Sequence, residues 1–186
     1  MQDEQIVALY WQRDEGAIAA TEKKYGAYLI KIAHNILASR EDSEESVNDT
    51  YLAAWESIPP QKPTVLSTYL AKLTRRIAID IYRMRSAQKR QGGEFAVSMC
   101  ELEDVLGGGT TPELEFETKL LGEALNRFLH ALSADERNTF IGRYFYMDPL
   151  REVAAYCGMS EGKAKSMLYR TRLKLRDYLR QEGLMQ

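Results

Sequence analysis

The chain has 186 residues, of which 45% are hydrophobic, so it can form one domain or two small ones without disulfide support. Its two cysteines, Cys100 and Cys157, lack the spacing of metal ligands or of a redox motif, which favours a reducing compartment. No segment has the length of a membrane-spanning helix, and the acidic N-terminus is unlike a secretory signal. We therefore expect a cytoplasmic protein without membrane insertion.

The net charge of −2 hides separate blocks of opposite charge. Residues 41–56 carry only acids, whereas residues 66–90 carry lysines and arginines against the single acid Asp80. Every charge in residues 91–117 is negative, and the C-terminal segment is basic again. Such segregation creates strong local fields. It predicts one anionic partner and one cationic partner.

Helical periodicity dominates the first part of the chain. Apolar spacing predicts an opening helix over 3–12 and a longer one whose core stripe runs from Ile18 to Ile36. Asp42, with Glu45 three residues later, resembles a capping box and predicts the start of a third helix.

Three prolines in residues 58–63 predict a loop, and a fourth helix follows from about Thr64 to Ala87. Basic residues alternate with Tyr69 and Tyr82 along this helix, a pattern typical of a surface for single-stranded nucleic acid. The alternative is that these tyrosines complete the core. The stripe predicted to be buried consists of Leu66, Leu70, Leu73, Ile77, Ile81 and Met84.

Residues 91–111 lose the helical periodicity and contain clustered glycines, which predicts a flexible acidic linker. Pro112, preceded by Thr111, predicts the start of a new helix, and Ser133 with Glu136 predicts a capping box for the next. The expected fold class is all-α, with an N-terminal helical domain over 1–90 and a C-terminal domain over 112–186.

Residues 148–180 predict two helices joined by a tight turn. Asp148 fits the N-cap of the first helix and Pro149 its first position, while Gly158 suits the turn and Ser160 caps the second helix. A short helix, a glycine-containing turn and a basic second helix are typical of a DNA-binding helix-turn-helix. A solvated helical hairpin has the same pattern.

Three stretches in this order resemble the extracytoplasmic-function sigma factors, the smallest sigma subunits of bacterial RNA polymerase. DSEESVNDTYLAAW (42–55) resembles the polymerase-binding helix of the family, and LSTYLAKLTRRIAIDIYRMR (66–85) resembles its promoter-melting helix. Residues 132–179 resemble its C-terminal helix-turn-helix domain. The resemblance implies a protein that directs core polymerase to specific promoters and helps to melt them, with no cofactor of its own.

The resemblance also implies functional residues at matching positions. Polymerase binding is assigned to Asn48, Asp49 and Trp55, with Trp55 equally suited to the core. Contact with the downstream promoter element and its melting are assigned to Lys72, Arg75, Arg76, Asp80 and Arg83. Contact with the upstream element is assigned to Lys163, Lys165, Ser166, Tyr169 and Arg170.

The loop 58–63 corresponds to the segment with which the family helps to capture a flipped base. Arg76, Tyr69 and Met167 stand where the family usually has Asn, Trp and Arg, which predicts an unusual promoter sequence. Acids of the linker could mimic nucleic acid, or the linker is a solvated tether.

The implied partners are the clamp and flap surfaces of core RNA polymerase, promoter DNA and, as is common in the family, an anti-sigma factor. A stand-alone helix-turn-helix regulator that binds duplex DNA as a dimer is the alternative function. An enzyme is not expected, because His34 and His130 are isolated and no phosphate loop, metal-ligand spacing or nucleophile elbow is present.

Overall fold

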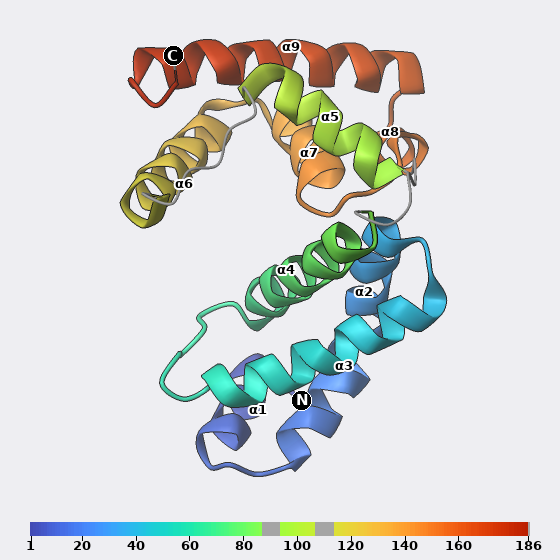
Figure 1. The fold of residues 1–186 in the computed structure, drawn as a ribbon, viewed down its shortest axis with the longest axis vertical. Coiled ribbons are helices and arrows are strands. Elements are labelled where there is room, and N and C mark those ends of the chain that lie inside the picture. Colours follow the sequence, from blue (N-terminus) through green and yellow to red (C-terminus); the bar gives the residue numbers. More distant parts are fainter. Residues whose placement is uncertain (87–93, 107–113, 186) are drawn as a thin grey trace. The chain divides into compact units, whose positions relative to one another are not determined.

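The computed structural model describes residues 1–86, 94–106 and 114–185. All regular secondary structure in these ranges is helical, which confirms the all-α fold class. None of the described helices is long and apolar enough to cross a membrane. The helices are α1 (Asp3–Trp11), α2 (Gly16–Leu37), α3 (Arg40–Ser57), α4 (Leu66–Ser86), α5 (Glu94–Leu106), α6 (Leu114–Ala131), α7 (Ala134–Tyr144), α8 (Leu150–Tyr156) and α9 (Glu161–Gln181) (Figure 1).

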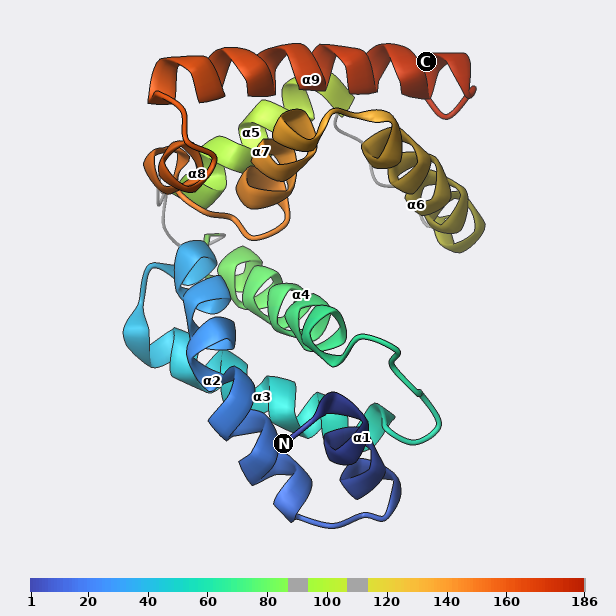
Figure 2. The ribbon, with the colours of Figure 1, turned by 180° about the vertical axis from the view of Figure 1, so that it is seen from behind.

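The chain divides into two compact units, Met1–Phe95 and Ala96–Gln186. The boundaries predicted from the sequence, at residues 90 and 112, fall outside the described ranges, as does the predicted helix start at Thr111 and Pro112. In the first unit α2, α3 and α4 pack against one another, and α1 lies against α2 (Figure 2). Their shared core includes Ile6, Tyr10, Leu29, Ala33, Val47, Ala54, Ile58, Leu66 and Leu70.

The start of α3 differs from the prediction. Ser39 is the N-cap, and its hydroxyl accepts the backbone N–H of Asp42 at 3.4 Å. The prediction that Asp42 caps this helix was wrong, because the Asp42 side chain is buried and accepts a hydrogen bond from Arg85 of α4. A carboxylate buried in this way needs a cationic partner. The pair therefore joins the beginning of α3 to the end of α4.

The buried face of α4 also differs in part from the predicted stripe. Leu66 and Leu70 are fully buried as expected, but Met84 is 67% exposed. Thr74 and the alanines of α4 take the buried positions further along, and the Thr50 hydroxyl of α3 bonds to that of Thr74 at 3.1 Å. Small side chains at these positions allow α3 and α4 to approach closely.

In the second unit α9 packs against α6, α7 and α8. The predicted Ser133–Glu136 capping box is present, and Ser160 caps α9 through the N–H of Lys163 at 3.3 Å. Gly158 has the predicted left-handed conformation, with φ of +64°. The core of this unit includes Ala124, Phe128, Phe140, Tyr144, Leu168, Leu175 and Leu179.

The start of α8 also differs from the prediction. Pro149 is the N-cap, and Asp148, predicted to cap the helix, is instead buried, where its carboxylate accepts the Tyr156 hydroxyl at 3.2 Å. Burial, followed by the nearby charge of Asp148, raises the pKa of Tyr156, so this hydroxyl stays protonated and acts as a donor. The bond closes α8 back onto the turn that precedes it.

α5 lies inside the stretch interpreted as a linker and was not predicted from the sequence. Phe95 at its start is buried and meets the ring of Tyr82 at 4.7 Å between centroids in an edge-on arrangement. Ser98 is buried and Leu102 packs against the core of the second unit. These three residues recur at helical spacing, which was the available signal.

Gly142 allows α7 and α8 to pack closely, and this yields a stability prediction. A Cβ at this position would overlap the Tyr156 hydroxyl, whereas one at Gly162 of α9 would meet no atom within 4 Å. We expect Gly142→Ala to lower the free energy of unfolding of the second unit by about 1–3 kcal/mol. The matched control, Gly162→Ala, should leave it unchanged or raise it by up to about 1 kcal/mol.

Native-state hydrogen exchange of α7 and α8 amides measures both effects. Equal stabilities for the two variants would contradict the close packing at Gly142.

Candidate nucleic-acid and polymerase interface

The residues predicted to contact the upstream element share the outer side of α9. Lys163, Ser166 and Arg170 follow one another at intervals of three and four residues, and Lys165 and Tyr169 form the adjoining row. All five are exposed. The inner side of the helix holds Ala164, Leu168, Thr171, Leu175 and Leu179, which are buried.

The beginning of α9 adds a further attraction for phosphate. The helix N-terminus carries a partial positive charge, and Lys163 and Lys165 lie within its first turns. Tyr169 is 56% exposed, so its ring is available at the surface. Arg172 lies over this ring, with its guanidinium carbon 5.9 Å from the ring centroid. The structure thus brings the predicted upstream residues together on one basic face.

The residues predicted for the downstream element lie along α4. Lys72, Arg76, Asp80 and Arg83 are exposed and recur at intervals of four, four and three residues, so they follow one face of the helix. Arg75 is half-buried at the edge of that face. Four of the five residues predicted to contact the downstream element therefore share one exposed face of α4, and Arg75 lies at its edge.

Tyr69 behaves as the alternative interpretation expected. It is half-buried, packs against the core of the first unit and donates a hydrogen bond to Ser57 at 2.7 Å. Tyr82 is likewise half-buried against Phe95. The rings of Tyr69 and Tyr82, which the sequence-based hypothesis expected to stack on bases, therefore pack largely against other residues of the protein.

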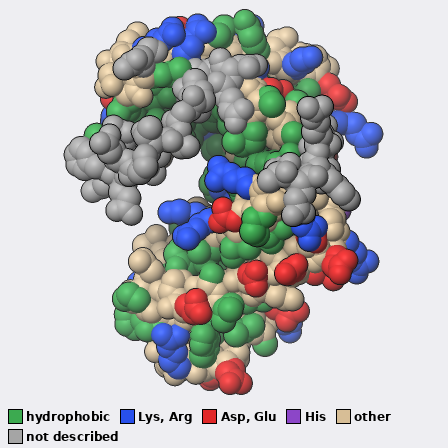
Figure 3. Space-filling view, in the orientation of Figure 1, with side chains coloured by type: hydrophobic (Ala, Val, Ile, Leu, Met, Phe, Trp, Pro, Cys, Tyr) green, Lys and Arg blue, Asp and Glu red, His purple; other side chains and the backbone are tan. Residues whose placement is uncertain are grey.

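The outer face of α3 is acidic. Asn48 and Asp49 are exposed, and acidic side chains follow the helix in the space-filling view (Figure 3). Leu52 lies one turn beyond Asn48 and is 55% exposed. An exposed leucine among polar side chains is a candidate contact residue, and it was not among those predicted from the sequence. Its signal was an apolar residue outside the buried helical stripe.

Trp55 does not belong to this outer face. It is half-buried and packs against the core, with Tyr10 at 6.3 Å between ring centroids. Arg13 also contacts the ring, with its guanidinium carbon 5.4 Å from the ring centroid, and donates to the Trp55 carbonyl at 2.5 Å. Trp55 therefore ties the end of α3 to α1 and the turn that follows it.

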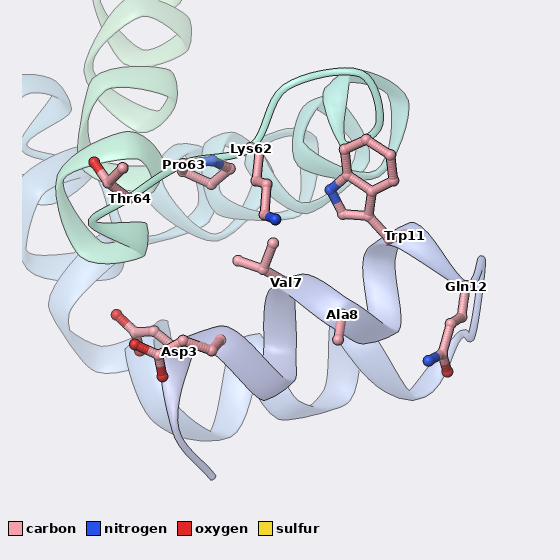
Figure 4. A pocket seen from close by; sticks show the side chains of 9 residues that line it. Asp3, Val7, Ala8, Trp11, Gln12, Lys62, Pro63 and Thr64 are labelled. Atoms are coloured by element: carbon pink, nitrogen blue, oxygen red, sulfur yellow. The ribbon is translucent and has the colours of Figure 1, made fainter.

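A cavity of about 660 Å³ lies between α1 and the proline-rich loop (Figure 4). Lys62, Pro63 and Thr64 form one side, and the side chain of Lys62 reaches toward Val7 of α1. Trp11, at the other end of α1, contributes an indole to the wall. The loop predicted to help capture a base therefore borders an open, partly apolar recess.

One basic helical face in each unit, one of them on a helix-turn-helix, is the arrangement expected of a DNA-binding protein. Comparisons with known proteins agree. Residues 23–89 match the family model of sigma-70 region 2, and residues 122–175 match that of sigma-70 region 4.

A curated relative is the ECF RNA polymerase sigma factor SigE of Mycolicibacterium smegmatis, which is 21% identical over 157 residues. The match covers 84% of this chain and 59% of the relative, so the chain spans less than two thirds of the relative's length. A similar solved structure is CnrH in complex with the cytosolic domain of CnrY, at 18% identity and a TM-score of 0.44 over 93% of this chain and 95% of that one. The chain belongs to the sigma-70 family of RNA polymerase sigma factors, in its extracytoplasmic-function group.

The position of Trp55 gives a prediction that separates packing from contact. Trp55→Ala removes the contacts with Tyr10 and Arg13, and we expect it to lower the unfolding free energy of the first unit by about 2 kcal/mol. Asn48→Ala, on the exposed face of the same helix, should change it by less than about 0.5 kcal/mol. Urea unfolding followed through the amide signals of α2 measures both, and a Trp55→Ala variant as stable as Asn48→Ala would contradict the packing role.

Proposed function

We propose that the protein is a promoter-specificity subunit: it binds core RNA polymerase, directs it to particular promoters and helps to open them. The observation that carries the proposal is the matching of regions 2 and 4, in family order, to two units that each present an exposed basic helix face. DNA affinity depends mainly on phosphate neutralisation, which such faces supply.

Each face has a proposed role. The acidic outer face of α3, with Asn48, Asp49 and the exposed Leu52, is proposed to bind a basic surface of the polymerase clamp. Its charge suits a cationic partner, and an isolated apolar residue inside a polar rim is a common arrangement in protein interfaces.

The face of α4 is proposed to hold the downstream element as it opens. Unpairing bases costs a few kcal/mol, so contacts made only with the separated strand favour melting. Lys72, Arg76 and Arg83 would bind its phosphates, and the recess beside Lys62 lies next to the loop proposed to accept an extruded base. The basic face of α9 is proposed to read the upstream element as duplex DNA.

An anti-sigma factor is a further proposed partner, supported by family membership. It would bind the free subunit and compete with core polymerase. The flap surface of the polymerase, proposed to contact the second unit, is supported in the same way.

The decisive experiment adds the protein to core polymerase and measures complex formation and transcription over a library of genomic promoters. We expect a stable complex and transcripts that begin at a limited set of sites. Each active promoter is then tested as a duplex and with its downstream element already mismatched, because a subunit that assists melting should be needed less on the open template. Failure to bind core polymerase would refute the proposal.

A second prediction concerns the upstream face. Lys165→Ala and Arg170→Ala each remove a phosphate-binding cation, so we expect weaker binding to duplex DNA and a salt dependence reduced by about one ion per substitution. Arg127→Ala is the matched control, because Arg127 is an exposed arginine of α6 in the same unit and pairs with Glu182, just beyond the end of α9, at 2.7 Å. Fluorescence anisotropy at several salt concentrations measures affinity and slope together. If all three variants behave alike, the α9 face is not the DNA contact.

A further inference from the structure

Two hydrogen-bond donors and a nearby guanidinium of the second unit converge on one carboxylate oxygen of α5. The Glu101 Oε2 accepts the Tyr144 hydroxyl at 2.8 Å and Nη1 of Arg172 at 3.2 Å, and it lies 3.7 Å from Nε of Arg143. Tyr144 and Arg143 belong to α7 and Arg172 to α9. A single carboxylate therefore joins α5 to both helices that it faces.

This contact is largely protected from water. The side chain of Arg143 is 2% exposed, that of Arg172 is 13% exposed and that of Glu101 is 26% exposed. Burial, followed by the hydrogen bond to Glu101, raises the pKa of Tyr144, so its hydroxyl remains a donor. Charges in such a setting attract more strongly and are screened less by salt than charges on the surface.

Glu101 is the carboxylate that pairs with Arg172 among the residues that the structure describes. The same Nη1 of Arg172 also donates to the Tyr144 oxygen at 2.6 Å. Removing the carboxylate would leave a mostly buried guanidinium without its anion, which is unfavourable. Apolar packing adds to the contact, because Leu102 of α5 lies against the core of this unit.

The contact reaches the basic face of α9 through Arg172. This residue follows Lys165 by seven positions and Tyr169 by three, so it lies at the edge of the same face. Its guanidinium carbon is 5.9 Å from the centre of the Tyr169 ring. Glu101 thus neutralises a cation beside residues proposed to contact DNA, and the α5 sequence contains four acids and no base.

We propose that α5 is an autoinhibitory latch, in which Glu101 holds Arg172 and withholds its charge from upstream DNA until the helix is released. Release supplies one further phosphate contact and removes an acidic helix from the edge of the binding face. The proposal deepens the proposed function and rests on it.

The test uses the full chain with Glu101→Gln, which keeps the size of the side chain but removes its charge. Glu123→Gln is the matched control, because Glu123 is an exposed acid of α6 in the same unit. Hydrogen exchange of the α5 amides measures release, and anisotropy with a random-sequence DNA duplex over a salt series measures DNA binding. A third variant combines Glu101→Gln with Arg172→Ala and tests whether the gain in DNA affinity depends on Arg172.

We expect α5 to exchange about tenfold faster in Glu101→Gln than in the wild type or in Glu123→Gln, since the charged contact no longer holds it. DNA affinity should rise several-fold at low salt, with a salt slope larger by about one ion, and the additional Arg172→Ala should cancel this gain.

Equal α5 exchange in the two single variants would overturn the latch, and so would faster exchange without any gain in DNA affinity over Glu123→Gln. If no variant bound DNA, the proposed function would fail, whereas the exchange result would still show whether Glu101 holds α5.

Discussion

The guanidinium of Arg143 is buried inside the second unit, and the packing around it depends on satisfying that charge. Burying a cation costs several kcal/mol unless hydrogen bonds and an anion offset the cost. Its Nη1 donates to the backbone carbonyl of Asp148 at 3.2 Å, and the Glu101 carboxylate lies 3.7 Å from its Nε. Asp148 in turn accepts the Tyr156 hydroxyl. One buried charge therefore connects α5, α7 and the turn that leads into the helix-turn-helix.

In the first unit, the packing of α2, α3 and α4 decides which side of each helix carries the charged residues. A helix in a three-helix bundle buries one side, so charged residues at helical spacing must share the other side. On α4 this places Lys72, Arg76 and Arg83 along one row, and on α3 it places Asn48 and Asp49 outward. Opposite charges thus lie on separate helices, each available to a different partner.

Local chemistry allowed much of this arrangement to be predicted from the sequence. The capping residues Ser133, Glu136 and Ser160, and the left-handed Gly158, depend only on neighbours in the chain. The outward positions of Lys163 and Arg170 follow from helical periodicity in the same way. The roles of these outward residues in binding stay predictions.

Long-range contacts account for the rest. Asp42 failed as a cap because its partner, Arg85, lies 43 residues further along the chain. Asp148 failed for a similar reason, because Tyr156 folds back onto it. In α5 the acids and flanking glycines outweighed the helical spacing of Phe95, Ser98 and Leu102, and the contacts of Glu101 with Tyr144 and Arg172 lie 43 and 71 residues away in the chain. The sequence pattern predicts which face of a helix is exposed, whereas contacts with residues distant in the chain decide which polar residues become buried.

The placement of the tryptophans has a practical consequence. The chain has two, Trp11 and Trp55, and both belong to the first unit. Trp55 is packed among Tyr10, Arg13 and the core, whereas Trp11 is 46% exposed beside the cavity at α1. Indole emission from the whole protein is therefore a selective optical signal from the first unit. The unit that carries the helix-turn-helix contributes no indole signal, so changes in the first unit can be followed in the uncut chain.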